Sequence, residues 1–153
     1  MAVYYLDTSA LTKFYALEPG STWITNLIES TDNHELFTIR ITGPEIIAAF
    51  LRKVRTKEIS RQVATRLITD FRADWQLRYQ VIEVTSTVTD RAMQLIEKHS
   101  LRGYDAVHLA AALALQEFRQ QLQLPALTFI SSDDEQVKVA KAEGLQIENP
   151  NLH

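Results

Sequence analysis

The chain has 153 residues, a formal net charge of −3, 46% hydrophobic residues and no cysteine. We therefore expect a single domain over residues 1–153 that buries its core without a disulfide or a zinc ribbon, and any metal must be held by oxygen or histidine. No apolar stretch approaches the ~20 residues that cross a bilayer, and the N-terminus lacks the basic and long apolar segments of a secretory signal, which predicts a cytoplasmic protein without a membrane partner.

In the N-terminal half, short apolar runs alternate with segments of helical spacing. Residues 3–6 are rich in strand formers and predict a buried strand. Helical spacing follows over 11–15 and, beyond a Pro-Gly break, over 23–28. Residues 36–39 predict a second strand. The segment 42–45, with an early proline and a glutamate three residues after a threonine, predicts the start of another helix.

A helix with a basic face follows. Apolar residues recur at every fourth position from Ile59 to Trp75, which predicts one buried face. Residues 52–78 carry eight basic side chains against three acidic ones, a local balance of +5. Such a segment forms either a solvated helix face or an arm that grips phosphate groups. The candidates for phosphate contacts are Arg52, Arg55, Arg61 and Arg66.

The C-terminal half continues the alternation. Residues 106–115 are apolar at every position except His108, and we expect them to form a central helix that is buried on most sides. The other predicted elements are a strand over 79–84, a helix over 88–96, a strand over 127–130, a helix over 132–143 closed by Gly144, and a strand over 145–147. Short apolar strands that alternate with helices indicate an α/β fold with a mainly parallel sheet.

Four acidic residues lie where such a fold places functional side chains. Asp7 and Asp133 each follow a predicted strand, at the edge of the sheet where open α/β folds bind their ligands. Glu45 and Asp105 each lie at the start of a predicted helix, where the helix dipole favours negative charge. The sequence therefore predicts that at least two carboxylates point at one region.

Each acid also has an ordinary structural explanation. Glu45 can close a capping box with Thr42, a similar box can begin at Ser132 with Asp133 in its first turn, and Asp105 can cap its helix. As a set they are harder to explain in this way. Two unit charges ~4 Å apart repel by about 4 kcal/mol at an effective dielectric of 20, so clustered carboxylates need a cation. Magnesium and manganese take oxygen ligands and suit carboxylates and hydroxyls.

Four segments of the sequence match one family. They are Tyr-Leu-Asp-Thr-Ser around Asp7, Glu45 in an apolar helix, Tyr-Asp-Ala-Val-His-Leu-Ala around Asp105, and Phe-Ile-Ser-Ser-Asp ending at Asp133. In this order and spacing they resemble PIN domains, and more narrowly the VapC-type toxins of bacterial toxin–antitoxin modules, over essentially the whole chain. The resemblance implies a PIN-like three-layer α/β fold, with a mainly parallel central sheet flanked by helices.

The resemblance also implies a site and a reaction. It implies an endoribonuclease that hydrolyses RNA with one or two Mg²⁺ or Mn²⁺ ions, leaving 5′-phosphate and 3′-hydroxyl ends without a covalent enzyme intermediate. Asp134 competes with its neighbour for the last ligand position, and Thr8 and Ser131 are either supporting hydroxyls or ordinary cap and turn residues. The implied ligands are Asp7, Glu45, Asp105 and Asp133.

The resemblance further implies partners. A toxin of this kind is held inactive by a cognate antitoxin, and we expect a homodimer. The antitoxin tail would lie across an exposed apolar groove near Asp7 and insert a basic side chain among the acids, because an arginine pairs well with carboxylates.

Three alternatives stay open from the sequence. His108 lies three residues after Asp105 and so shares its helix face, which allows either a proton shuttle or a satisfied core histidine. The chain could be another Mg²⁺-dependent phosphohydrolase or a receiver domain, although the segment after Asp7 lacks the second aspartate of aspartyl-phosphate hydrolases. It could also be a PIN-like scaffold that binds RNA or protein without catalysis.

Overall fold

One parallel sheet forms the centre of the structure, a computed structural model that describes residues 1–153. Its order is β3-β2-β1-β4-β5, and every neighbouring pair is parallel. In register, Tyr5 lies between Phe37 and Phe129. The strands are β1 (Val3–Leu6), β2 (Glu35–Ile39), β3 (Gln80–Ile82), β4 (Thr128–Ile130) and β5 (Gln146–Glu148).

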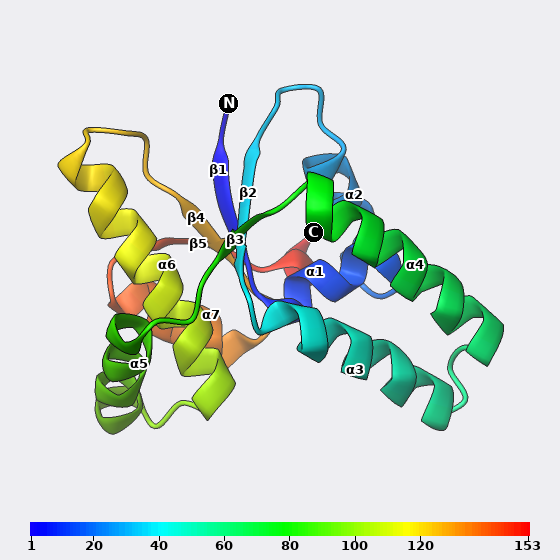
Figure 1. Cartoon of the computed structure of the whole chain (residues 1–153). Helices are drawn as coiled ribbons and strands as arrows, with labels where there is room; N and C mark the ends of the chain where they lie inside the picture. Colours follow the sequence, from blue (N-terminus) through cyan, green and yellow to red (C-terminus); the bar gives the residue numbers. More distant parts are fainter.

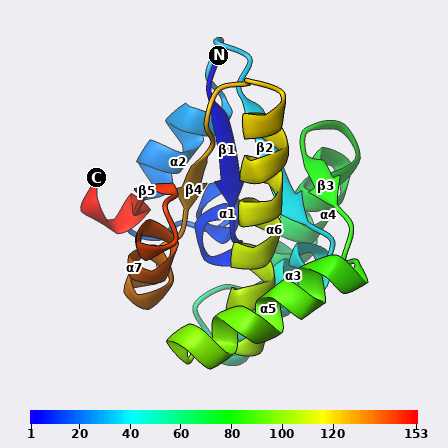
Figure 2. The same ribbon diagram turned by 90° about the vertical axis from the view of Figure 1, so that its left-hand side faces the viewer.

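Helices cover both faces of the sheet and complete a three-layer α/β fold (Figure 1). One layer contains α1 (Thr8–Tyr15), α2 (Ser21–Ile28), α3 (Thr42–Arg55) and α4 (Arg61–Leu77). The other contains α5 (Ser86–His99), α6 (Gly103–Gln121) and α7 (Asp134–Ala142). In Figure 2, α6 runs in front of the sheet, α5 crosses near its lower end and α7 lies to one side. A short 3-10 helix, η1 (Pro150–Leu152), lies at the C-terminus, and His153 stacks on Trp23 of α2.

Each face of the sheet has its own core because successive strand side chains point to opposite sides. Val3 and Tyr5 of β1 pack into the core under α5, α6 and α7, whereas Leu6 packs into the core under α1 to α4. Helix α6 buries residues on several sides, from Ala106 through Leu113, as the sequence predicts for a central helix.

The strand order creates a switch point at the middle of the sheet. The chain passes outward from β1 to β2 and β3, then crosses back to place β4 on the other side of β1. Open α/β sheets have a crevice at the carboxyl ends of the strands on either side of such a point. Asp7 directly follows β1, and its N–H donates to the carbonyl oxygen of Ile130 at 3.1 Å. The crevice therefore lies beside Asp7 and the residues after β4.

The predicted elements occur in the predicted order, but several of their boundaries differ; β5, for example, covers Gln146–Glu148 rather than 145–147. Strand β3 covers only Gln80–Ile82 rather than 79–84. Ile59 precedes α4 instead of beginning it, because Ser60 is the N-cap and its hydroxyl accepts a hydrogen bond from the N–H of Val63. None of the helices combines the length and apolar character that crossing a membrane requires.

Candidate active site

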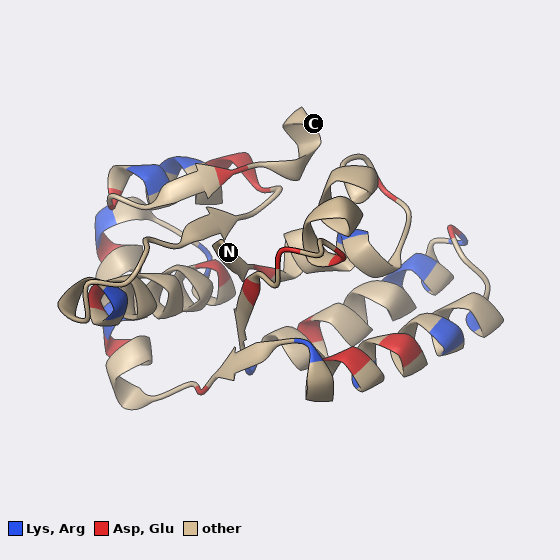
Figure 3. Cartoon of the chain, turned by 90° about the horizontal axis from the view of Figure 1, so that it is seen from above, with Lys and Arg blue, Asp and Glu red and all other residues tan.

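A groove of about 1400 Å³ opens at the carboxyl ends of β1 and β4. One wall comes from α1 and α3, and the other from α5 and the first turns of α6. Acidic segments occur near the middle of the molecule, between the layers, as well as on its outer surface (Figure 3). The groove is lined by all four acids expected from the sequence, Asp7, Glu45, Asp105 and Asp133.

Asp7 is the most deeply placed of these acids, with 3% of its surface exposed. Its Oδ1 accepts hydrogen bonds from the Ser9 hydroxyl at 2.6 Å and from the Ala10 N–H at 3.0 Å, so it also caps α1. Burial raises the pKa of Asp7, against the opposing effects of His108 and the nearby Ser131 and Ser9 hydroxyls. Burial therefore disfavours the ionised form of Asp7, and the surrounding hydrogen bonds offset this effect only in part.

Glu45 is held through one oxygen. Thr8 donates its hydroxyl to Glu45 Oε1 at 2.7 Å, and Nε2 of His108 lies 2.8 Å from the same oxygen. Partial burial acts to raise the pKa of Glu45, but the hydrogen bonds and charge of His108 and the hydrogen bond of Thr8 lower it overall. These contacts cannot be predicted from local sequence, because the three residues come from three different helices.

Asp105 and Asp133 share one arginine. Arg102 Nε lies 3.4 Å from Asp105 Oδ2, and Arg102 Nη2 lies 3.2 Å from Asp133 Oδ2. Burial raises the pKa of Asp105; Arg102 opposes this rise, and the charges of Asp7 and Asp133 add to it. Like charges in one groove disfavour one another's ionised forms, which is why Asp7 and Asp133 act in the same direction on Asp105. Sequence reasoning missed Arg102, although its position three residues before Asp105 is a helical i, i+3 spacing.

The structure distinguishes Asp133 from Asp134. Asp133 lines the groove, and its Oδ1 caps α7 by accepting a hydrogen bond from the N–H of Gln136 at 3.0 Å. Asp134 does not line the groove; its Oδ1 accepts a hydrogen bond from Asn149 Nδ2 at 2.9 Å. Only Asp133 is placed to join the other acids.

The hydroxyl residues around the site hold its backbone. Ser131 is fully buried, and its hydroxyl accepts a hydrogen bond from the N–H of Asp133 at 3.2 Å. Ser9, which sequence reasoning passed over, accepts a hydrogen bond from the N–H of Ser132 at 3.0 Å. Ser9 therefore ties α1 to the segment after β4 and keeps Asp7 beside that segment.

The capping explanations for these acids are largely wrong. The N-cap of α3 is Ile41, without a side-chain cap bond, and the Thr42 hydroxyl instead lies 2.7 Å from the Thr38 hydroxyl. The N-cap of α6 is Arg102, so Asp105 lies inside the first turn and makes no cap. At α7 the cap is Asp133 itself rather than Ser132. Only Asp7 and Asp133 combine a cap with a place in the groove.

The donors fit a hard divalent cation in type but are not assembled around one. The groove offers carboxylate and hydroxyl oxygens and no thiol, which suits Mg²⁺ or Mn²⁺. No three Asp, Glu or His side chains converge within metal-binding distance. Arg102 pairs with two of the four carboxylates, so part of their negative charge is already balanced by this guanidinium.

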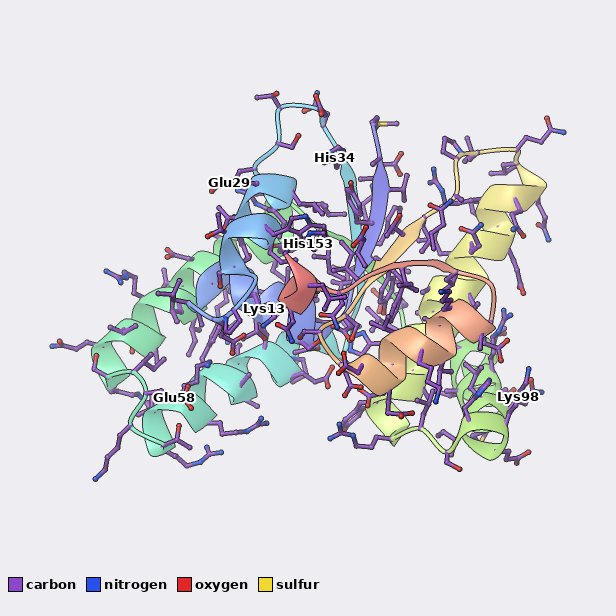
Figure 4. The ribbon with its side chains drawn as sticks, turned by 180° about the vertical axis from the view of Figure 1, so that it is seen from behind. Lys13, Glu29, His34, Glu58, Lys98 and His153 are labelled. Atoms are coloured by element: carbon purple, nitrogen blue, oxygen red, sulfur yellow. The ribbon has the colours of Figure 1, made fainter.

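The basic arm is only partly directed at the groove. Arg52 lines it, whereas Arg55, Arg61 and Arg66 are exposed elsewhere on α3 and α4. At the base of the arm, Glu18 accepts ion pairs from Lys53 at 2.8 Å and from the almost fully buried Lys13 at 3.5 Å. Lys53 also pairs with Glu58, which lies in the turn between α3 and α4; Lys13 and Glu58 are labelled in Figure 4. These pairs fix the arm against α1.

Comparison with known proteins identifies relatives of the chain. The family model described as PIN domain matches residues 4–142. Two proteins of Mycobacterium tuberculosis, named ribonuclease VapC45 and ribonuclease VapC49, are each 33% identical over 118 residues, which cover 75% of this chain and 78% of theirs. Among solved structures, the crystal structure of VapBC2 from Rickettsia felis bound to a promoter DNA fragment matches with a TM-score of 0.62 and 17% identity, covering 96% of this chain and 98% of that chain. The last likeness is one of fold.

Proposed function

The chain belongs to the PIN-domain family, and on that premise we propose that it is an endoribonuclease that hydrolyses RNA phosphodiester bonds with Mg²⁺ or Mn²⁺. The observation that carries the proposal is that four acids, from two strand ends and two helix starts, line one groove. The names of the two relatives at 33% identity support a ribonuclease. Because RNA is the substrate, the proposed place of action is the cytoplasm.

In this proposal the carboxylates Asp7, Glu45, Asp105 and Asp133 hold the ion. A bound divalent ion would supply the positive charge that acidifies water for attack and neutralises charge on the phosphate oxygens. The side chains divide the remaining work. Ser9 and the Ala10 N–H orient Asp7, and Thr8 orients Glu45. The carboxylate oxygens that these donors leave open can accept a proton from attacking water.

The proposal has a direct test. The purified protein should cleave RNA when Mg²⁺ or Mn²⁺ is added and stop when EDTA removes the ion. Asp7→Asn and Asp105→Asn should abolish cleavage while the circular dichroism spectrum stays that of the wild type. Asp134→Asn is the matched control, because Asp134 lies outside the groove, and it should cleave at the wild-type rate. RNA binding without cleavage under any metal would favour a scaffold instead.

The proposed biological role is the toxin of a toxin–antitoxin pair, acting as a homodimer and restrained by a cognate antitoxin. The wall of the groove carries exposed apolar side chains, with Leu17 94%, Met93 55% and Tyr104 64% exposed, which suit a bound partner segment. Arg102 pairs with both Asp105 and Asp133, which supports the idea that an antitoxin arginine could displace this exposed side chain and pair with the same acids.

Co-expression tests this role. The chain expressed alone should arrest growth, and both Asp7→Asn and the cognate antitoxin should relieve the arrest. Size-exclusion chromatography with light scattering should give a dimer. Unimpaired growth with abundant, folded wild-type protein would contradict the toxin role and leave the test of RNA cleavage standing by itself.

A further inference from the structure

A chain of buried polar groups leads from the core of the sheet to one acid of the groove. Tyr5 lies in β1 and is completely buried, and its hydroxyl is 3.0 Å from Nδ1 of His108. His108 lies in α6, is 2% exposed and reaches Glu45 Oε1 in α3 at 2.8 Å through Nε2. Thr8 donates to the same oxygen at 2.7 Å. Donors from α1 and α6 therefore meet on one carboxylate oxygen of α3, and β1 supports one of them from behind.

The hydrogen-bond directions in this chain follow from what each atom can do. An ionised carboxylate only accepts, so Nε2 of His108 must carry the hydrogen that it shares with Glu45. The Tyr5 hydroxyl has no partner other than His108, and its hydrogen is satisfied when Nδ1 accepts it. The direction is thus Tyr5 to His108 to Glu45. Glu45 and Tyr5 therefore favour the same histidine tautomer, with the hydrogen on Nε2 and a bare Nδ1.

The hydrogen bonds from Thr8 and His108 hold one oxygen of Glu45 and leave the other oxygen open. Oε1 receives both donors, whereas Oε2 has no hydrogen-bond donor in the protein, and 25% of the Glu45 side chain is exposed in the groove. A buried hydroxyl or imidazole without a partner would cost roughly 1–3 kcal/mol, so each member of the chain depends on the next. Phe in place of Tyr5 and Leu in place of His108 would fit these apolar surroundings without any need for hydrogen-bond partners.

We propose that His108 is a positioning residue that, with Tyr5 behind it and Thr8 beside it, aims Glu45 Oε2 into the groove to take part in divalent-metal binding. The inference rests on the proposed function and adds to it a set of residues behind the ligand. Partners that orient a metal ligand typically change metal affinity by about 10- to 100-fold when removed.

The first test is Mn²⁺ binding to the purified protein, measured by calorimetry and by the electron paramagnetic resonance signal of free Mn²⁺. His108→Gln keeps a donor near the position of Nε2, and His108→Asn keeps one only near Nδ1. We expect roughly 10- to 100-fold weaker binding for the Asn variant and a smaller loss for the Gln variant. Equal losses in the two variants, or none in either, would overturn the proposal.

The second test separates positioning from folding. Tyr5 does not touch Glu45, so Tyr5→Phe should weaken Mn²⁺ binding several-fold only through His108. That loss should disappear in a Glu45→Gln background, since the double mutant removes the group that the chain orients. Tyr4→Phe is the matched control, because Tyr4 is the adjacent tyrosine of the same strand, belongs to the opposite core and makes no contact with His108. A Tyr5→Phe loss that persists in the Glu45→Gln background would show a merely structural role.

The third test reads the tautomer directly. ¹⁵N spectra of the histidine rings should show a protonated Nε2 and an unprotonated Nδ1 for His108 in the wild type, and the Nδ1 signal should shift in Tyr5→Phe, where Nδ1 loses its hydrogen bond. A protonated Nδ1 in the wild type would refute the direction of the chain. If the wild-type protein binds no Mn²⁺ and cleaves no RNA, the proposed function fails; if it does both while the His108 variants bind normally, only this inference fails.

Discussion

Replacing Arg102 by glutamine should tighten the binding of divalent metal to the groove. Arg102 pairs with Asp105 at 3.4 Å and with Asp133 at 3.2 Å, and 83% of its side chain is exposed. Exposed ion pairs of this kind contribute about 0.2–1 kcal/mol each, so the two together contribute roughly 0.4–2 kcal/mol. A metal ion that uses these carboxylates must displace the guanidinium and lose that amount. Since 1.4 kcal/mol corresponds to a tenfold change, Arg102→Gln should lower the Mn²⁺ dissociation constant by roughly 2- to 30-fold.

The assay is a Mn²⁺ titration by calorimetry at two salt concentrations. The gain should shrink as salt rises, because exposed charges are screened over about 10 Å at 0.1 M ionic strength. Arg91→Gln is the matched control, since it removes the same charge from an ion pair with Glu117 while Arg91 lies outside the groove lining. Any change seen in this control measures the effect of net charge alone.

The reasoning would be refuted by Mn²⁺ affinity in Arg102→Gln that is equal to, or weaker than, that of Arg91→Gln. Such a result would mean that Arg102 does not compete with the metal for Asp105 and Asp133. It would leave the placement of the four acids untouched.

Three further predictions follow from the charges. Without metal, Asp7→Asn should raise the melting temperature at neutral pH, because burial raises the pKa of Asp7 and destabilises its ionised form, while asparagine can still cap α1. This gain should vanish as the pH falls towards the ordinary Asp pKa of about 3.9, where the carboxyl group is protonated. A melting temperature equal to that of the wild type at both pH values would contradict this prediction. On acidification, Mn²⁺ affinity should begin to fall at a higher pH than at an ordinary carboxylate site, since burial raises the pKa of both Asp7 and Asp105. Calorimetry in buffers of different ionisation enthalpy should also show that protons are released when Mn²⁺ binds. Binding without proton release would count against this prediction. If the basic arm (residues 52–78) binds RNA, a variant with glutamine at Arg52, Arg55, Arg61 and Arg66 should depend less on salt than the wild type. Each lost phosphate contact should reduce the slope of log affinity against log salt by about 0.7. An unchanged slope would mean that the arm is a solvated face.

The sequence predicts the strands and helices well because their signals are local. Residues 3–6 and 127–130 are short apolar runs, and both form buried strands at the middle of the sheet. The apolar surface of residues 106–115 likewise predicts the central helix, since only a helix packed on several sides can bury it. The predicted strand over 79–84 lies at the position of β3 but is too long. A side chain such as Tyr79 can be buried by packing although its backbone does not join the hydrogen-bonded sheet.

The contacts between side chains were not predictable in the same way. Thr42 and Glu45 have the spacing of a capping box, yet Thr42 lies against Thr38 and Glu45 turns towards Thr8. The capping-box spacing fails as a predictor here because polar groups from other elements are available as hydrogen-bond partners for both residues. His108 shows the same limit: as one histidine in an apolar helix it reads as a core residue, and only the fold brings Tyr5 and Glu45 to its two nitrogens.

The strand order explains why four acids so distant in sequence line one groove. Asp7 and Asp133 follow β1 and β4, which are neighbours only because the chain crosses back over the sheet after β3. Glu45 and Asp105 then arrive from opposite layers, one from α3 and the other from α6, so no single helix or loop could carry all four. Packing of the two cores fixes these elements in place, so the fold can keep the acids in one groove despite their mutual repulsion. The cost of that repulsion falls on the metal-free fold, and a bound cation would return it as binding energy.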